Sequence, residues 1–162
     1  MLKEESKELL KEFGWYEGRK INIDEIINIC EKEGFEVFEE AKKIFEEFGG
    51  LILEEPTGAQ LEHRFDIIQL SSRLGYNGVL SEGLTELLGE KVLKIGIIYS
   101  GQYYIYVSES GKIYSDVGFL TNDIYDAINY LLETLTKEEK EEKGIFKLWK
   151  DIGIDISVCY TV

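Results

Sequence analysis

The sequence is short of the residues on which secreted, membrane and many catalytic proteins depend. Its 162 residues include two cysteines, one histidine and one proline. Two cysteines are too few for a disulfide framework, so we interpret Cys30 and Cys159 as free thiols in a reducing compartment. No apolar run approaches the roughly 20 residues of a membrane-spanning helix, and the N-terminal MLKEESKELL lacks the apolar segment of a signal peptide. We therefore expect a cytoplasmic protein without membrane contacts.

A single histidine restricts metal and nucleophilic chemistry. Zinc sites usually take several histidine or cysteine ligands, and a catalytic triad here has only His63 to use. The sequence contains no G-x-S-x-G nucleophile elbow, no phosphate-binding loop and no dinucleotide-binding glycine pattern. Carboxylate pairs arise by chance among 32 acidic residues, so they are uninformative. We predict no catalytic residue, no metal ligand and no cofactor, and a small carboxylate-based enzyme is the catalytic alternative.

Basic residues are also scarce. The chain carries 18 lysines and arginines against 32 acidic residues, a formal net charge of -14. Residues 1–50, 51–100 and 101–162 contribute -6, -3 and -5, so the negative charge is distributed and not confined to a tail. Such a surface repels nucleic-acid phosphates and anionic lipids, and it attracts basic proteins. We expect a basic protein partner and no nucleic acid, although a charge that serves only solubility is the simpler alternative.

Hydrophobic periodicity predicts one α+β domain over residues 1–162, with helices packed around a mainly antiparallel sheet. Asn22 and Asn122 stand where the N-caps of two of the helices are expected. The expected helices are 4–13, 23–33, 37–48, 81–88 and 123–135, with a short one around Phe146 and Trp149. The expected strands are 51–53, 63–68, 91–99, 102–108, 112–117 and 154–161.

Tyrosines gather in the strands expected between residues 91 and 117. Sheets that bind nucleic acids combine such aromatic residues with basic ones, and Lys112 is the only basic residue between Tyr99 and Tyr114. Partly buried tyrosines of a sheet and a protein-binding face are the two remaining interpretations. The residues that we predict to contact a protein partner, because they combine aromatic rings with negative charge, are Tyr103, Tyr104, Tyr106, Glu109 and Asp116.

The stretch GWYEGR, residues 14–19, has the composition of either a structural corner or a binding loop. We expect Gly14 to end the first helix and Trp15 to fold back over apolar helix faces. The planar guanidinium of Arg19 should hold a carboxylate or loop carbonyls. Contact with a partner is the alternative, because tryptophan and arginine are favoured at the centres of interfaces.

The motif G-W-x-x-G-R, followed about thirty residues later by F-G-G-L, resembles the SUKH immunity proteins, and most closely their third subgroup. The similarity continues through Phe65-Asp66, Gly75, Ile95-Gly96, the strands from Tyr103 to Tyr114 and the helix from Asp123. It covers about residues 5–135, and residues 136–162 form a C-terminal extension that includes the charged run 137–143. The signature residues, which we expect to be structural, are Gly14, Trp15, Gly18, Arg19, Phe48, Gly49, Gly50 and Leu51.

The resemblance implies an α+β antitoxin of bacterial polymorphic toxin systems. Such proteins bind and neutralise a cognate toxin domain, frequently a nuclease or a deaminase, and the resemblance brings no cofactor and no catalytic residue. We therefore expect a non-enzymatic immunity protein that covers a basic toxin domain. The superfamily also includes regulators of cell-wall synthesis and secretion, so an intracellular regulatory or scaffold protein is the alternative. The sequence indicates no oligomeric state.

Overall fold

The structure is a computed structural model that describes residues 1–56, 61–74, 79–136 and 147–157. Side chains are described for all of these residues except 72–74 and 79–82. Several residues used in the sequence analysis lie outside the described part of the chain, namely Gly75, the charged run 137–143, Phe146 and Cys159.

One antiparallel sheet organises the described residues. Its strands are β1 (Ile52–Glu54), β2 (Glu62–Arg64), β3 (Val92–Ile98), β4 (Tyr103–Ser108), β5 (Ile113–Ser115), β6 (Gly118–Thr121) and β7 (Lys147–Leu148). Each strand pairs with the next one along the chain, so the order in space is the order in sequence. Short connections produce this arrangement from β3 to β6, because neighbouring strands joined by a few residues pair in opposite directions. Strands β2 and β3 are connected through α4 and α5, and β6 and β7 are connected through α6.

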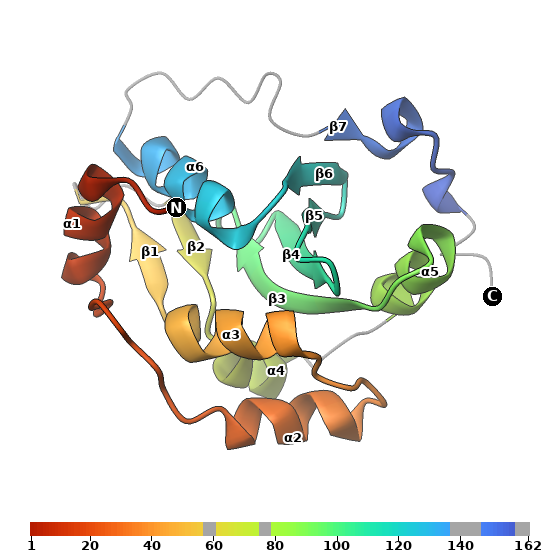
Figure 1. Ribbon diagram of the computed structural model, residues 1–162, viewed down its shortest axis with the longest axis horizontal. Coiled ribbons are helices and arrows are strands. Elements are labelled where there is room, and N and C mark those ends of the chain that lie inside the picture. Colours follow the sequence, from red (N-terminus) through yellow and green to blue (C-terminus); the bar gives the residue numbers. More distant parts are fainter. Residues whose placement is uncertain (57–60, 75–78, 137–146, 158–162) are drawn as a thin grey trace.

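Helices surround this sheet, as Figure 1 shows. Helices α3 and α6 cover one face together, and α5 lies at the other end of the molecule beside β3 and the C-terminal segment. The helices are α1 (Glu4–Glu12), α2 (Asp24–Lys32), α3 (Glu39–Phe48), α4 (Ile67–Leu74), α5 (Val79–Leu88) and α6 (Ile124–Thr136), with the 3₁₀ helix η1 (Trp149–Ile152). None of them is long and apolar enough to cross a bilayer.

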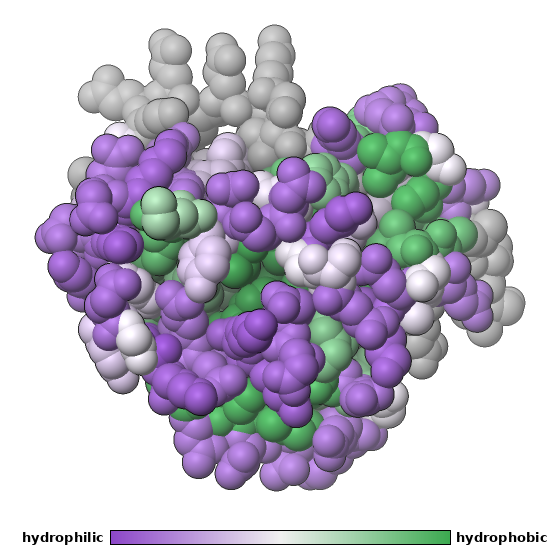
Figure 2. All heavy atoms as spheres, in the orientation of Figure 1, coloured by the Kyte–Doolittle hydropathy of each residue, from purple (hydrophilic) through white to green (hydrophobic). Residues whose placement is uncertain are grey.

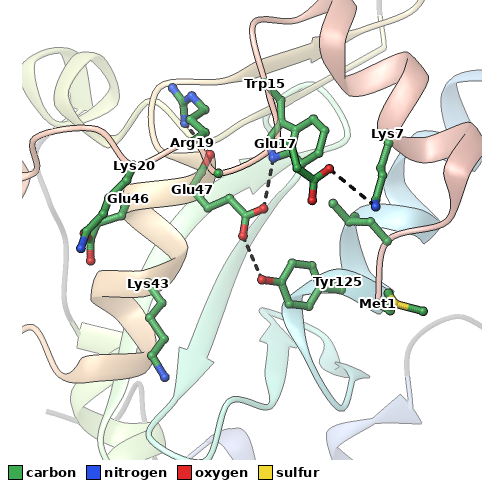
Figure 3. A pocket seen from close by; sticks show the side chains of 12 residues that line it. Met1, Lys7, Trp15, Glu17, Arg19, Lys20, Lys43, Glu46, Glu47 and Tyr125 are labelled. Atoms are coloured by element: carbon green, nitrogen blue, oxygen red, sulfur yellow. Dashed lines mark hydrogen bonds and ion pairs between the residues drawn. The ribbon is translucent and has the colours of Figure 1, made fainter.

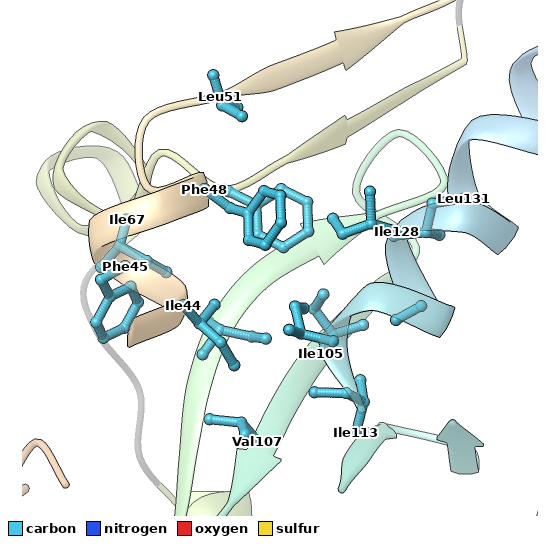
Figure 4. Packing of buried hydrophobic residues seen from close by; sticks show 14 of the residues in the cluster. Ile44, Phe45, Phe48, Leu51, Ile67, Ile105, Val107, Ile113, Ile128 and Leu131 are labelled. Atoms are coloured by element: carbon cyan, nitrogen blue, oxygen red, sulfur yellow. The ribbon is translucent and has the colours of Figure 1, made fainter. Parts of the chain in front are cut away.

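The main hydrophobic core lies between α3, α6 and the sheet (Figure 4). Helix α3 contributes Ala41, Ile44, Phe45 and Phe48, whose spacing places all four on one face of the helix. Strands β3, β4 and β5 contribute the residues that point to the same side of the sheet, and α6 contributes Ile128 and its neighbours. This packing fixes the position of the C-terminal end of α3.

A smaller core lies on the opposite face of the sheet. It is formed by Leu84 of α5, Val92, Tyr106 and Tyr114 of the strands, and Trp149 of η1. The Trp149 ring stacks on Tyr114 with 5.5 Å between ring centroids, and its Nε1–H donates to the carbonyl of Asp116 at 2.7 Å. The C-terminal segment therefore covers a face of the sheet that would otherwise be exposed to solvent.

The α+β class and the antiparallel sheet predicted from the sequence are confirmed. The strand expected at 63–68 stops at Arg64, because Asp66 begins a helical turn in which its carbonyl accepts the N–H of Leu70 at 3.1 Å. The strand expected at 154–161 is wrong for residues 154–157, where Ile154 and Ile156 pack against the smaller core without pairing to the sheet. Residues 158–161 lie outside the described chain, and strand β6 was not anticipated.

The cap of α6 also differs from the prediction. The side chain of Asp123, not that of Asn122, accepts the backbone N–H of Asp126 at 2.8 Å. At the start of α2, Asn22 accepts the N–H of Asp24 at 2.8 Å, so its side chain forms the turn that leads into the helix. Both corrections are shifts of one or two residues, which local sequence patterns rarely resolve.

The burial of Trp149 predicts that the C-terminal segment contributes to stability. Trp149→Ala should lower the free energy of unfolding by about 3–5 kcal/mol, because it removes a stacked and hydrogen-bonded indole. Ile152→Ala on the same segment is the control, and its loss should stay under about 1 kcal/mol because Ile152 is exposed. Urea unfolding of both variants measures the difference, and equal losses would contradict the assigned packing.

Candidate functional site

A hollow of about 740 Å³ lies where the signature loop meets α1, α3 and α6 (Figure 3). Its lining includes Trp15 and Arg19 of the signature, Glu47 of α3 and Tyr125 of α6. The helices meet here because the main core has already fixed α3 and α6 relative to each other. The hollow is therefore a product of the fold, and the signature loop completes one of its walls.

Trp15 forms part of that wall as a buried residue. Its side chain retains 3% of its exposure, and its backbone N–H donates to the carbonyl of Leu10 at the end of α1. Gly14, with a positive φ of 101°, lets the chain reverse there. The indole Nε1–H donates to Oε2 of Glu47 at 3.1 Å. The loop is thus tied both to the helix that precedes it and to α3.

Glu47 lies at the centre of the hollow. While Oε2 accepts the Trp15 indole, Oε1 accepts the Tyr125 hydroxyl at 2.9 Å, and Figure 3 shows both bonds converging on the carboxylate. Burial and this hydrogen bond to Glu47 raise the pKa of Tyr125 to about 12, so the phenol stays a donor. The carboxylate joins the signature loop to α6 across the end of α3.

Arg19 binds the C-terminal end of α3. One guanidinium nitrogen donates to the carbonyl of Glu47 at 2.5 Å, and another donates to the carbonyl of Gly49 at 2.8 Å. Carbonyls at the end of a helix lack partners within the helix, and a cation is favoured there. Burial lowers the pKa of Arg19 below its ordinary value, but the guanidinium remains charged. Arg19 was predicted to hold a carboxylate or loop carbonyls, and its acceptors are the carbonyls at the C-terminal end of α3.

The F-G-G-L signature forms the turn from α3 into β1. Phe48 and Leu51 are buried in the main core. A Cβ on Gly49 would lie 2.3 Å from the carbonyl oxygen of Phe45, so no larger residue fits. Gly50 adopts a positive φ of 84° and donates its N–H to the carbonyl of Phe65. Gly18, the remaining signature glycine, lies on the exposed loop between Trp15 and Arg19, where it lines the hollow.

Among the described residues, the lysines that line the hollow form ion pairs, whereas Glu47 does not. Lys7 lies 3.6 Å from Glu17, Lys20 lies 3.5 Å from Glu46, and Lys43 lies 3.3 Å from Glu40 outside the lining. Glu47 forms no ion pair with any described residue, since its two partners are neutral donors. The floor of the hollow therefore carries a fixed negative charge, and the lysines lining the hollow are already paired with carboxylates.

The five residues predicted to contact a partner do not form one surface. Tyr103 points to the face of the main core and packs edge-on against Tyr99 with 6.0 Å between centroids. Tyr104 and Tyr106 point to the opposite face. Glu109 is exposed at the turn after β4, where it accepts the N–H of Lys91 at 2.7 Å. These five residues therefore do not share one face on which they could contact a partner together.

Two of these five residues are bound to each other. Tyr106 retains 2% of its exposure, so the expectation that it offers surface to a partner is corrected. Its hydroxyl donates to Oδ1 of Asp116 at 2.9 Å, and the N–H of Tyr104 donates to Oδ2 at 2.8 Å. Burial of the β4–β5 face by the C-terminal segment explains the correction, because sequence periodicity alone does not show which segment covers a face.

A buried lysine beside this pair escaped the sequence analysis. Lys94 of β3 retains 4% of its exposure, and its Nζ lies 3.9 Å from the centroid of the Tyr104 ring. Burial lowers the pKa of Lys94 to about 8, although the nearby Asp116 opposes the shift. Burial likewise raises the pKa of Asp116. The only sequence signal was the position of Lys94 within the apolar run VLKIGII.

His63 is part of the core. It is fully buried, its Nε2 lies 2.9 Å from the hydroxyl of Thr134, and its Nδ1 accepts the N–H of Tyr99 at 3.1 Å. The described residues contain no group of three or more histidine, cysteine or acidic side chains that could hold a metal ion.

A family model described as SUKH-3 immunity protein matches residues 2–134 of the chain. This range includes the signature loop and nearly all of the lining of the hollow, and it ends inside α6. Strand β7 and Trp149 lie beyond it. Searches of curated proteins and of solved structures found no match.

The corner at GWYEGR predicts different outcomes for two adjacent aromatic residues. Trp15→Ala should lower the free energy of unfolding by about 3–5 kcal/mol, because it removes a buried indole. Tyr16 is 55% exposed, so Tyr16→Ala should change stability by less than about 1 kcal/mol. Thermal and urea unfolding measure both variants. An unchanged melting curve for Trp15→Ala would assign the tryptophan to partner contact instead.

The buried Lys94 predicts a pH dependence of stability. The unfolded chain keeps its proton up to a pKa near 10.5, whereas the folded chain releases it near 8. Between these values the unfolded state binds more protons, so the free energy of unfolding rises with pH. The free energy of unfolding of Lys94→Met should not show this rise. The ionisation of tyrosines affects the wild type and the variant alike, so it cancels when their free energies of unfolding are subtracted. Urea unfolding below, within and above the window tests this, and parallel curves would contradict it.

Proposed function

Because the chain belongs to the family of SUKH-3 immunity proteins, we propose that it neutralises one cognate bacterial toxin domain by binding it. The complex forms in the cytoplasm of the producing cell, and the bound protein covers the active site of the toxin or a surface next to it. No bond is made or broken on the immunity protein in this mechanism. The family match over residues 2–134 is the observation that carries the proposal.

The charge of the molecule supports a basic toxin domain as the partner. The net charge is -14, and hydrophilic side chains cover most of the face shown in Figure 2. A surface of this sign raises the rate of encounter with a basic protein, by about 10- to 1,000-fold at low ionic strength. Toxin domains that act on nucleic acids, such as nucleases and deaminases, need basic surfaces to bind their substrates. An acidic inhibitor can occupy the same basic surface.

The hollow is the proposed centre of the contact. Its walls are held by hydrogen bonds among Trp15, Arg19, Glu47 and Tyr125, so binding there costs little conformational entropy. Tyr16 lies on the same loop and is 55% exposed, as an aromatic contact residue requires. A standard interface buries about 800 Å² on each partner. That area is about a tenth of the accessible surface of 8934 Å².

Co-expression tests the proposed function. The partner to be tested is the C-terminal domain of a large secreted protein encoded by a neighbouring gene, produced at a level that stops growth. The wild-type chain should restore growth and co-purify with that domain. A toxin domain that neither associates with the chain nor is silenced by it would contradict the proposal for that pair.

Two surface variants compare the hollow with the turn after β4. Tyr16→Ala should weaken toxin binding at least about tenfold, a loss of about 1.4 kcal/mol, because it removes an exposed aromatic contact beside the hollow. Glu109→Ala should leave the affinity within about twofold, since Glu109 does not line the hollow. Titration calorimetry with the purified toxin domain measures both. The opposite pattern would move the contact to β4 and β5 and restore the prediction made for Glu109.

A further inference from the structure

We propose that the hollow is a socket for an arginine side chain of the toxin domain, with the Glu47 carboxylate as its acceptor. The inference rests on the proposed function for the source of the arginine. The socket itself is argued from three properties of the hollow: the free acceptor capacity of Glu47, the pairing of the surrounding charges, and the aromatic walls.

The Glu47 carboxylate retains room for a second pair of hydrogen bonds. An ionised carboxylate has about four acceptor positions on its two oxygens. Each oxygen accepts one bond within the protein, from the Trp15 indole at 3.1 Å and from the Tyr125 hydroxyl at 2.9 Å. These donors hold both oxygens in a fixed orientation in the hollow (Figure 3). A guanidinium donates two parallel N–H bonds and matches two oxygens held in this way.

Glu47 is the acidic residue of the lining that forms no ion pair with a described residue, although the nearby guanidinium of Arg19 interacts with its charge. The other acidic residues of the lining, Glu17 and Glu46, lie 3.6 Å and 3.5 Å from lysine amines. Arg19 is close to Glu47, but its guanidinium donates to backbone carbonyls at the end of α3. A charged group that is partly buried with only neutral donors is stabilised when a cation joins it. The hollow thus favours a cationic ligand.

The walls favour guanidinium over a simple ammonium. The half-buried ring of Tyr125 lies beside Glu47 in Figure 3, and planar guanidinium groups stack on aromatic faces. The Trp15 ring is buried, so it contributes through its hydrogen bond to Glu47. An anionic ligand would meet the Glu47 charge at the floor and would find Lys7, Lys20 and Lys43 already paired with carboxylates. Arginine is also a frequent energetic centre of protein interfaces.

The full-length protein allows a direct test with small probes. Nitrogen-15 NMR follows the two indole N–H signals, because Trp15 lies in the hollow and Trp149 lies on the other side of the sheet. The probes are the acetylated amides of arginine, norleucine and glutamate. The arginine probe should shift the Trp15 signal in a saturable way and leave the Trp149 signal unchanged. The norleucine and glutamate probes should not saturate. No saturable shift, or saturation by glutamate, would overturn the socket.

Two matched variants test whether binding of the arginine probe depends on the Glu47 carboxylate. Glu47→Gln should weaken binding of the arginine probe at least about tenfold, because the charge-assisted bonds are lost. Glu46→Gln, the neighbouring residue on α3, should change it by less than about twofold. If Glu47→Gln does not fold, the acetylated amide of citrulline, a neutral isostere of arginine, decides with the wild-type chain. Binding of this probe at least about tenfold weaker than that of the arginine probe supports the socket. Equal binding of the two probes overturns it, as does equal weakening by both glutamine variants.

Experiments with the toxin domain distinguish a failure of the arginine socket from a failure of the proposed function. A folded Glu47→Gln variant should co-purify poorly with the toxin domain and protect cells poorly. Full protection by this variant would overturn the arginine socket and leave the immunity function intact. Failure of the wild-type chain to protect would overturn the proposed function, whatever the small probes do.

Discussion

The carbonyl groups at the end of α3 need hydrogen-bond partners, and Arg19 provides them from a loop that lies far away in sequence. The same turn of helix carries Glu47, whose side chain binds Trp15 and Tyr125. One helix end therefore joins the signature loop, α3 and α6. Removing any member leaves a partly buried polar group without its partner, which costs more than the net value of a single hydrogen bond. The hollow exists because this joint holds its walls in place.

The hydrogen bonds of this joint hold the walls of the hollow in fixed positions. Its groups are satisfied by one another, apart from the acceptor capacity that Glu47 presents to the hollow, so the site is ready to bind without rearrangement. The buried Lys94 and Asp116 on the other side of the sheet are covered by Trp149 and its neighbours. The helices that pack on one face of the sheet line the hollow, and the C-terminal segment packs on the other face.

Much of this could be predicted from local patterns. The apolar spacing of α3 and α6, the alternation in β3 to β5 and the short turns between strands were enough for the α+β class and the antiparallel sheet. The planar guanidinium of Arg19 was enough to predict that it binds a carboxylate or backbone carbonyls. Glu47 gave no comparable signal, because it is one of 32 acidic residues and its neighbour Glu46 looks the same in sequence. Tyr106 was misjudged because alternation places a side chain on a face without saying what covers that face.

The sequence by itself determined most of the helices and strands, the apolar side of each, the sign of the net charge and the family signature. These depend on neighbours within a few positions, or on composition. The tertiary structure alone decided that Glu47 meets Trp15 and Tyr125, that Lys94 is buried, and that Trp149 covers the β4–β5 face. Those contacts join residues tens of positions apart, and only the packing of the helices on the sheet brings them within hydrogen-bonding distance.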